Sequence, residues 1–379
     1  MQVPFIDLQR LDHVVELSAI TRVVERGWFL GGCEVAAFET AFAKAVGAAY
    51  AIAVANGTDA LEIGLRALGI QPGDEVATVA NAGMYATTAI RAIGARPLYV
   101  DIEPETLLMC PLSLGAAMGP ETRAIVATHL YGQMARMPEI LEVGKKFDVP
   151  VVEDCAQAHG AQLAGRPAGS WGAVGTFSFY PTKNLGSYGD AGAMVTSDAA
   201  VSERARHLRE YGWTKRFHSA VAGGRNSRMD EIQAAVLAAR LPGLGEANRR
   251  RLEIAKEYQT ALASVPGVRP VAFDDSYVAH LFVVRCGQRD ALREWLTARD
   301  IQTQIHYPIP DYRQCSQAGL DRRMASLETS FGTSLETGLE TGLETTERAA
   351  REILSLPCYP GLRDDEVAYV SKCLREWRP

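Results

Sequence analysis

Short apolar runs alternate with amphipathic stretches of helical period between residues 49 and 198 of the chain. Several of the apolar runs are continuous, as expected for strands with helices on both sheet faces. The order strand, helix, strand predicts a mostly parallel sheet with right-handed crossovers, and therefore an α/β fold. The predicted strands are 49–56, 75–81, 96–102, 124–132, 150–156, 176–182 and 192–197, and the predicted helices are 58–68, 84–94 and 138–147.

The pattern changes after Val201, where long charged helical segments predominate. The change from alternating strands and helices to long helices with few strands predicts a smaller C-terminal α+β domain. We therefore divide the chain into a large domain at 1–245, with an N-terminal arm, and a small domain at 246–379. Predicted helices cover 202–212, 229 to about 262, 291–300 and 364–377, and predicted strands cover 281–286 and 301–305.

Residues 326–347 repeat the tetrapeptide L-E-T-G/S/T. A leucine at every fourth position could line one helix face, but threonine and glycine are poor helix formers. The composition therefore favours a mobile surface loop without catalytic residues.

Composition narrows the classes of function. A net charge of −6 argues against nucleic-acid binding, which usually accompanies an excess of Lys and Arg. The first residues lack the layout of a signal peptide, and no apolar run is long enough to span a membrane. The seven cysteines are scattered without a C-x-x-C pair, so we expect no metal site, no disulfides and a cytoplasmic location.

Two predicted strands lead into residues with side chains that could take part in catalysis or bind a cofactor. Asp154 ends the strand PVVED, at the sheet edge where α/β proteins bind ligands, and could pair with a protonated pyridine nitrogen. Lys183 follows the strand TFSFYPT, where burial would favour the neutral amine that attacks an aldehyde. Ser178 lies between two phenylalanines, and its inward hydroxyl needs a partner such as a phosphate. The simpler alternatives are a helix N-cap for Asp154 and an exposed loop for Lys183.

The segment VANGTDAL passes from a predicted strand into a predicted helix. The free N–H groups of a helix N-terminus, next to Gly57 and the Thr58 hydroxyl, form a phosphate cradle. An ordinary N-cap would look the same. The segment lacks the G-x-G-x-x-G spacing of a dinucleotide fingerprint, and the chain has no P-loop.

Together these motifs resemble the DegT-type sugar aminotransferases, which are fold-type I enzymes that use pyridoxal phosphate (PLP). The resemblance runs nearly end to end through NGTDAL, GDEV, HLYG, EDCAQAHGA, FSFYPTKN, GDAGAMV and NSRMDEIQAAVL. It implies a central, mostly parallel sheet of the seven-stranded type with a smaller C-terminal α+β domain.

The resemblance also implies roles for individual residues and a homodimer with shared active sites. Lys183 forms the Schiff base with PLP and moves protons, Asp154 pairs with the pyridinium nitrogen, and Gln157 lies near the phenolic oxygen. Gly57, Thr58 and Ser178 bind the phosphate, and Asn226 reaches the phosphate of the neighbouring subunit's cofactor.

The residue that covers the PLP ring is left open. Family members often place an aromatic residue just after the GDEV strand, and counting without gaps puts Gly83 there. Met84 and Tyr85 are the alternatives. The family includes dehydratases in which histidine replaces the lysine, so the presence of Lys183 favours amino transfer.

Candidate substrate residues come from three segments. IHYPIPDY is similar to the HYPxP segment of relatives that aminate C3 of a nucleotide-linked keto sugar, although Asp311-Tyr312 stand where relatives often carry another histidine. That segment supplies His306 and Tyr307. The others are Trp28 and Phe29, which either close the substrate site or pack in the core, and Tyr180 and Tyr188, which flank Lys183.

His129 and His159 follow predicted strand ends and either line the site or are structural.

The predicted reaction moves an amino group from L-glutamate to a nucleotide-linked, dTDP in our expectation, 3-keto-6-deoxyhexose. One alternative is amination at C4 by an enzyme of the same family. Another is a regulator that binds PLP without turnover, against which the intact Lys183, Asp154 and Ser178 argue.

Overall fold

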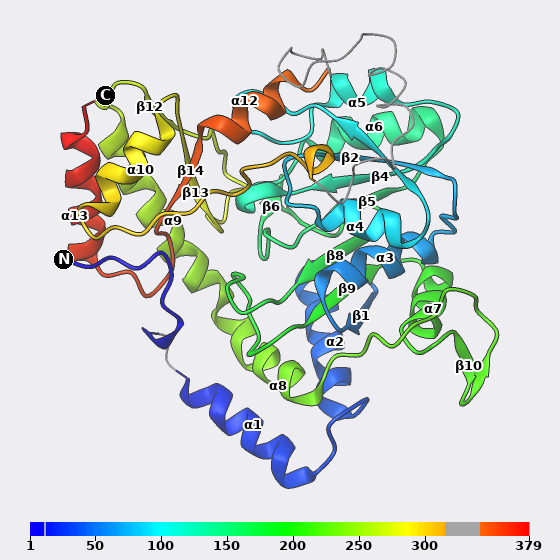
Figure 1. Cartoon of the computed structure of the whole chain (residues 1–379). Coiled ribbons are helices and arrows are strands. Elements are labelled where there is room, and N and C mark those ends of the chain that lie inside the picture. Colours follow the sequence, from blue (N-terminus) through cyan, green and yellow to red (C-terminus); the bar gives the residue numbers. More distant parts are fainter. Residues whose placement is uncertain (11–12, 315–341, 379) are drawn as a thin grey trace.

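The computed structural model describes residues 1–10, 13–314 and 342–378. A seven-stranded sheet has the strand order β1-β9-β8-β5-β4-β2-β3 (Figure 1). Its strand β9 runs antiparallel to both neighbours, and the remaining neighbouring pairs are parallel. The predicted α/β fold is therefore confirmed. The strands are β1 (Tyr50–Val54), β2 (Glu75–Val79), β3 (Arg96–Val100), β4 (Thr122–Thr128), β5 (Val151–Asp154), β8 (Val174–Ser178) and β9 (Gly192–Thr196).

Helices cover both faces of this sheet because its strands are apolar on both sides. In β1, Ala51 and Ala53 pack into one core while Ile52 and Val54 pack into another. The first core includes side chains of α2 (Cys33–Val46), α5 (Pro111–Ala117), α6 (Met137–Phe147) and α8 (Glu231–Arg240), and the second those of α3 (Gly57–Ala67), α4 (Tyr85–Ala92) and α7 (Ala199–Leu208).

The C-terminal part has its own three-stranded antiparallel sheet and a separate core around Tyr258 and Phe282. The predicted boundary at 245/246 lies inside helix α9, and the division into two domains stays a prediction. The elements here are α9 (Leu244–Leu262), β12 (Val268–Pro270), β13 (Phe282–Cys286), α10 (Arg289–Thr297), α12 (Glu344–Glu352), β14 (Ile353–Leu356) and α13 (Asp364–Glu376).

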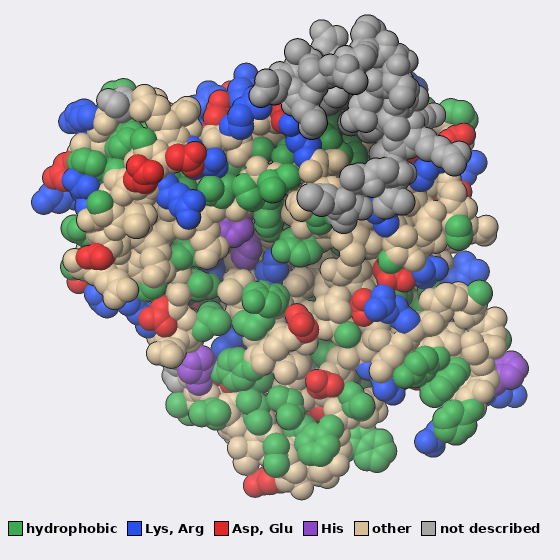
Figure 2. Space-filling model, viewed as in Figure 1, with side chains coloured by type: hydrophobic (Ala, Val, Ile, Leu, Met, Phe, Trp, Pro, Cys, Tyr) green, Lys and Arg blue, Asp and Glu red, His purple; other side chains and the backbone are tan. Residues whose placement is uncertain are grey.

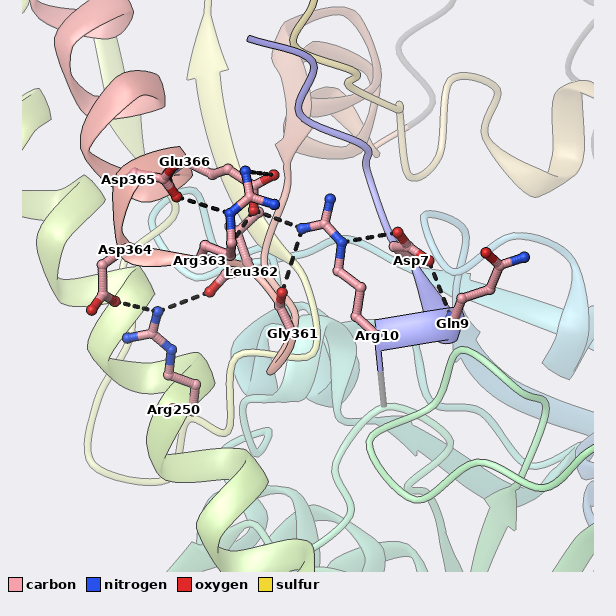
Figure 3. A network of polar contacts seen from close by, with 10 residues as sticks. All are labelled: Asp7, Gln9, Arg10, Arg250, Gly361, Leu362, Arg363, Asp364, Asp365 and Glu366. Carbon is pink, nitrogen blue, oxygen red and sulfur yellow. Dashed lines mark hydrogen bonds and ion pairs between the residues drawn. The ribbon is translucent and has the colours of Figure 1, made fainter. Parts of the chain in front are cut away.

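The N-terminal ten residues lie against this C-terminal part. The N–H of Val3 donates to the Asp300 carbonyl at 2.8 Å, and the Phe5 ring stacks on His306 at 5.7 Å between centroids. Arg10 places Nη1 2.7 Å from the buried carboxylate of Glu366 on α13 (Figure 3). Long-range contacts thus hold the N-terminal segment to the last helix.

Some predicted elements differ from the observed ones. The 301–305 strand was wrong, because only single bridges form there, at Ile301 and Gln304. The 229–262 helix is interrupted by a 3-10 turn (Leu241–Gly243) containing a proline. Helix α1 (Val14–Arg26) was not among the predicted elements, nor were α2, α5 and the short pairs β6 (Gln162–Leu163) with β7 (Arg166–Pro167) and β10 (Trp213–Lys215) with β11 (His218–Ser219).

The repetitive segment 326–347 lies outside the described residues up to 341. Its last four residues begin α12, so the loop prediction was wrong for them. The reason is Asp101, whose carboxylate accepts the N–H groups of Thr345 and Thr346 and the Thr346 hydroxyl at 2.8–3.1 Å. Free N–H groups at a helix start need such partners.

Among the described residues, no helix has both the length and the apolar character that crossing a membrane requires.

Candidate active site

Three predicted segments meet at one edge of the large sheet. Asp154 ends β5 and pairs in register with Thr176 of β8, while Ser178 ends β8 and pairs with Gly192 of β9. Gly192 also pairs with Val54 at the end of β1, which leads into α3. The ends of these adjacent strands therefore bring Asp154, Ser178 and the start of α3 together, as expected from the sequence.

Gly57 packs directly against Ser178. A Cβ at position 57 would lie 2.6 Å from the Ser178 Cβ, so only glycine allows this approach. Asn56 caps α3 by accepting the N–H of Asp59 at 2.8 Å. The N–H groups of Gly57 and Thr58 belong to the first turn, whose donors have no intrahelical acceptor. First-turn donors and the Ser178 hydroxyl together suit a phosphate group.

Lys183 lies just beyond β8 in a tight turn, where its N–H donates to the Tyr180 carbonyl at 2.8 Å. Burial lowers the pKa of its amine to about 8, and the nearby negative charge of Asp154 opposes this shift. An amine with this pKa is about one-tenth neutral at pH 7, far more than an ordinary lysine, and the neutral form is the one that reacts with an aldehyde.

The Asp154 carboxylate is buried, with 5 % of the residue exposed. Burial raises its pKa, and the N–H of Ala156, which donates at 3.1 Å, and the charge of Lys183 oppose the rise. A buried carboxylate gains strongly from a cationic partner, so it can keep a proton on a bound pyridine nitrogen. The N-cap alternative is not observed, because β5 is followed by a turn rather than a helix.

Gln157 connects this edge to the predicted substrate segment. Its Oε1 accepts the N–H of Tyr131 at 2.6 Å, and its Nε2 donates to the Tyr307 hydroxyl at 3.3 Å. The Tyr131 hydroxyl in turn donates to the carbonyl of His306 at 2.6 Å, and His306 Nδ1 lies 2.9 Å from the Ser355 hydroxyl. The His306-Tyr307 segment is therefore held beside Gln157.

Sequence reasoning missed a network next to Lys183. The amide of Asn184 accepts from His280 Nδ1 at 3.0 Å and donates to Asn248 Oδ1 at 2.8 Å and to the Val278 carbonyl at 3.0 Å. Burial lowers the pKa of His280 well below its usual value, and the charge of Lys183 adds to this. The position of Asn184 directly after Lys183 was the only signal available.

Asp311 was also missed as a structural residue. It is 1 % exposed, and its carboxylate accepts the N–H of Met84 at 2.9 Å and the Thr87 hydroxyl at 2.6 Å. Burial raises its pKa to about 6. Gly83 and Met84 both have left-handed backbone, with φ of 79° and 73°, so Asp311 stabilises a turn that a non-glycine residue rarely adopts.

We call residues 271–281 and 301–314 the C-terminal loops. They contribute His280, His306, Tyr307 and Asp311 to the region around the sheet edge.

Other predicted site residues lie farther out. Trp28 and Phe29 are 59 % and 49 % exposed, so core packing does not account for them. The Tyr188 hydroxyl hydrogen-bonds His13, and its ring packs under Arg240.

Asn226 is exposed, and its side-chain oxygen accepts a hydrogen bond from Arg228 Nε at 3.1 Å. The exposed Tyr180 adjoins Lys183 through the backbone bond described above, and Tyr85 is 49 % exposed.

The two ambiguous histidines have different environments. His129 accepts the N–H of Ala135 at 3.0 Å and donates from Nε2 to Glu153 at 2.9 Å, so it is structural. His129, Glu153 and Cys155 lie close enough to hold a metal ion, but the Glu153 carboxylate is already hydrogen-bonded by backbone N–H groups at 2.6–2.9 Å.

His159 is 1 % exposed between Phe177 and Phe179. Burial lowers its pKa to about 3, so it is neutral at pH 7.

The functional groups gathered at the sheet edge match the chemical groups of PLP. A partly neutral amine, a buried carboxylate and a phosphate cradle match its aldehyde, its pyridine nitrogen and its phosphate. Lys183, Asp154, Gly57, Thr58 and Ser178 would hold these three groups, and Gln157 lies beside them.

Comparisons with known proteins agree with this chemistry. The model of the DegT/DnrJ/EryC1/StrS aminotransferase family matches residues 12–375. The chain is 41 % identical to the dTDP-3-amino-3,4,6-trideoxy-alpha-D-glucose transaminase of Streptomyces venezuelae, over 99 % of this chain and 96 % of that protein. It is 40 % identical to the dTDP-3-amino-3,6-dideoxy-alpha-D-galactopyranose transaminase of Aneurinibacillus thermoaerophilus, over 99 % of each. The crystal structure of S. venezuelae DesV in complex with a ketimine intermediate superposes with a TM-score of 0.91 at 40 % identity, covering 99 % of this chain and 98 % of that one.

Proposed function

The chain belongs to the DegT/DnrJ/EryC1/StrS aminotransferase family of PLP-dependent enzymes, and we propose that it aminates a nucleotide-linked keto sugar. In this proposal the amino donor is L-glutamate and the acceptor is a dTDP-linked 3-keto-6-deoxyhexose. The product is then a 3-amino-3,6-dideoxy sugar nucleotide.

PLP supplies an electron-withdrawing ring that makes a proton on the adjacent carbon labile. In the proposal Lys183, with its pKa of about 8, holds the cofactor covalently and then takes and returns that proton. Asp154 keeps the ring nitrogen protonated from its buried position. Ser178 and the first turn of α3 bind the phosphate and fix the position of the ring.

Amination at C3 is supported by two relatives. Both are named as transaminases of dTDP-linked 3-amino deoxy sugars, and they are 41 % and 40 % identical to this chain over 99 % of its length. His306 and Tyr307 lie beside Gln157, so their segment is available to bind the sugar.

A homodimer with shared sites is the second part of the proposal. Several large apolar side chains of α1 and the segment after it are exposed, and Figure 2 shows apolar groups gathered at the bottom of the view, where α1 and α8 lie. Exposed apolar patches of this kind commonly mark protein interfaces. Asn226 is exposed, as required of a residue that reaches a neighbouring subunit. The apolar residues are Val14, Val15, Leu17, Val24, Trp28 and Phe29.

The test offers the purified protein L-glutamate with dTDP-linked 3-keto and 4-keto 6-deoxyhexoses in parallel, each repeated with UDP in place of dTDP. We expect conversion of the dTDP-linked 3-keto sugar and a new amine at C3 in the NMR spectrum of the product. An amine at C4 would contradict the position, and faster conversion of the UDP sugar would contradict the nucleotide. Turnover by a Lys183→Ala variant would contradict the role of the lysine.

A further inference from the structure

We propose that Tyr307 provides the aromatic surface that covers the PLP ring, and that Gly83 exists at its position so that this tyrosine fits. The ring-covering residue would then come from a C-terminal loop instead of the segment after β2. This assignment rests on the cofactor and concerns a different residue from those that hold it.

The packing of Gly83 against Tyr307 is the first observation. A Cβ at position 83 would lie 2.8–2.9 Å from three consecutive ring atoms of Tyr307, Cδ1, Cε1 and Cζ. A point at the edge of a ring is clearly nearer to one atom than to its two neighbours, so these nearly equal distances place Gly83 over the ring face. The Tyr307 ring therefore occupies the space that an aromatic side chain at position 83 would enter.

The second observation is that Tyr307 is held toward the cofactor residues. Its hydroxyl accepts from Gln157 Nε2 at 3.3 Å, and Gln157 lies three residues after Asp154. Backbone next to it is fixed by the hydrogen bond from the Tyr131 hydroxyl to the His306 carbonyl. One face of the ring rests on Gly83, and in this assignment the opposite face is the one that meets the cofactor.

The neighbours of Gly83 are less suited to this role. The Tyr85 ring is 49 % exposed and meets Tyr307 edge to face, with centroids 6.1 Å apart and planes at 74°. The backbone of Met84 is tied to Asp311, which holds the turn beneath Tyr307. Offset or edge contacts between aromatic rings are favourable, so Tyr85 serves to orient Tyr307.

The test measures PLP binding to apoprotein for Tyr307→Leu, Tyr307→Phe, Tyr85→Leu and Tyr50→Leu. Binding is followed by the visible absorbance of the bound cofactor and by the rise in melting temperature that PLP produces. Loss of an aromatic face should weaken PLP binding by about three- to tenfold in Tyr307→Leu. Tyr307→Phe keeps the face and should bind within about twofold of the wild type. Tyr85→Leu removes the edge contact that orients Tyr307 and should weaken PLP binding less than Tyr307→Leu does. The exposed Tyr50 begins β1, at the end opposite the site, so Tyr50→Leu should bind PLP like the wild type and serves as the matched control.

Two outcomes would overturn the assignment. One is wild-type PLP affinity in Tyr307→Leu, and the other is a larger loss in Tyr85→Leu than in Tyr307→Leu. If instead Tyr307→Phe raises the KM for the sugar while all four variants bind PLP normally, Tyr307 contacts the substrate through its hydroxyl and does not cover the ring. The melting temperature of each apoprotein separates a folding defect from a loss of cofactor contact.

Discussion

The sheet edge and the C-terminal loops are the two sides of the site that contact each other through Gln157 and Asn184, and they differ in how they are built. The sheet edge consists of strand ends and a helix start, where the backbone fixes Asp154, Ser178 and Gly57 by strand register. The C-terminal loops place His280 and Tyr307 through side-chain hydrogen bonds to residues far away in sequence. We therefore expect substitutions at the sheet edge to abolish chemistry and substitutions in the loops to tune it.

The largest effect is expected for Asp154→Asn. An amide cannot keep the ring nitrogen protonated, and removing one partner of a buried ion pair costs roughly 3–5 kcal/mol, or about two to four orders of magnitude. The measurement is kcat at saturating PLP. The exposed Asp148→Asn is the matched control and should retain full activity. A kcat for Asp154→Asn within a few fold of the wild type would refute this role.

A smaller effect is expected when the network beside Lys183 is broken. His280→Ala and Asn184→Ala each remove the same 3.0 Å hydrogen bond, so each should lower kcat by up to about tenfold with little change in the KM for the sugar. Asn184 makes two further hydrogen bonds, to Asn248 and to the Val278 carbonyl, so Asn184→Ala should be the poorer single variant. The double variant should be no worse than Asn184→Ala if His280 acts only through Asn184. Additive losses in the double-mutant cycle would show that the two residues act separately.

Asp311 predicts a specific dependence of stability on pH. Its pKa in the folded protein is raised to about 6 from an ordinary 3.8, so this group favours the fold at acidic pH, and the benefit is lost as pH rises toward and beyond 6. The shift corresponds to at most about 3 kcal/mol. Asp311→Asn lacks this titration, so its free energy of unfolding should improve relative to the wild type between pH 4 and pH 7. Urea unfolding at several pH values checks this, and a constant difference would contradict it.

The smallest effect is expected for Tyr131→Phe. This change removes the 2.6 Å hydrogen bond to the His306 carbonyl, worth about 1 kcal/mol. We expect the KM for the sugar to rise about fivefold, and PLP binding, which depends on the position of Tyr307, to weaken by less than this. An unchanged KM would show that the His306-Tyr307 segment is held by its other contacts, including the Ser355 hydroxyl.

The contrast between the two sides also explains what the sequence could predict. Asp154, Ser178 and Lys183 could be found because each ends or follows a recognisable apolar strand, and parallel strands end at the same edge. The contact between Asp311 and Met84 spans 227 positions, and no local pattern announces it. The histidines show the same limit, since the structural role of His129 depends on Glu153 on a neighbouring strand and on the turn at Ala135.

Tyr307 illustrates the point most directly. From the sequence, only Gly83, Met84 and Tyr85 could be considered as the residue that covers the PLP ring. They follow the GDEV strand, after which relatives often place an aromatic residue for this purpose. The residue that packs on Gly83 comes from a loop more than 200 positions later, and only the packing of the two revealed it.

The contacts between the first ten residues and the C-terminal part affect how the protein can be truncated or tagged. Phe5 stacks on His306, and Arg10 forms an ion pair with the buried Glu366 of α13, so the start of the chain packs against the segment that we propose binds the sugar. Removing residues 1–5, or fusing a bulky tag close to Phe5, should weaken sugar binding before it affects the cofactor. An expression design that treats these residues as dispensable would misjudge the enzyme's affinity for its acceptor.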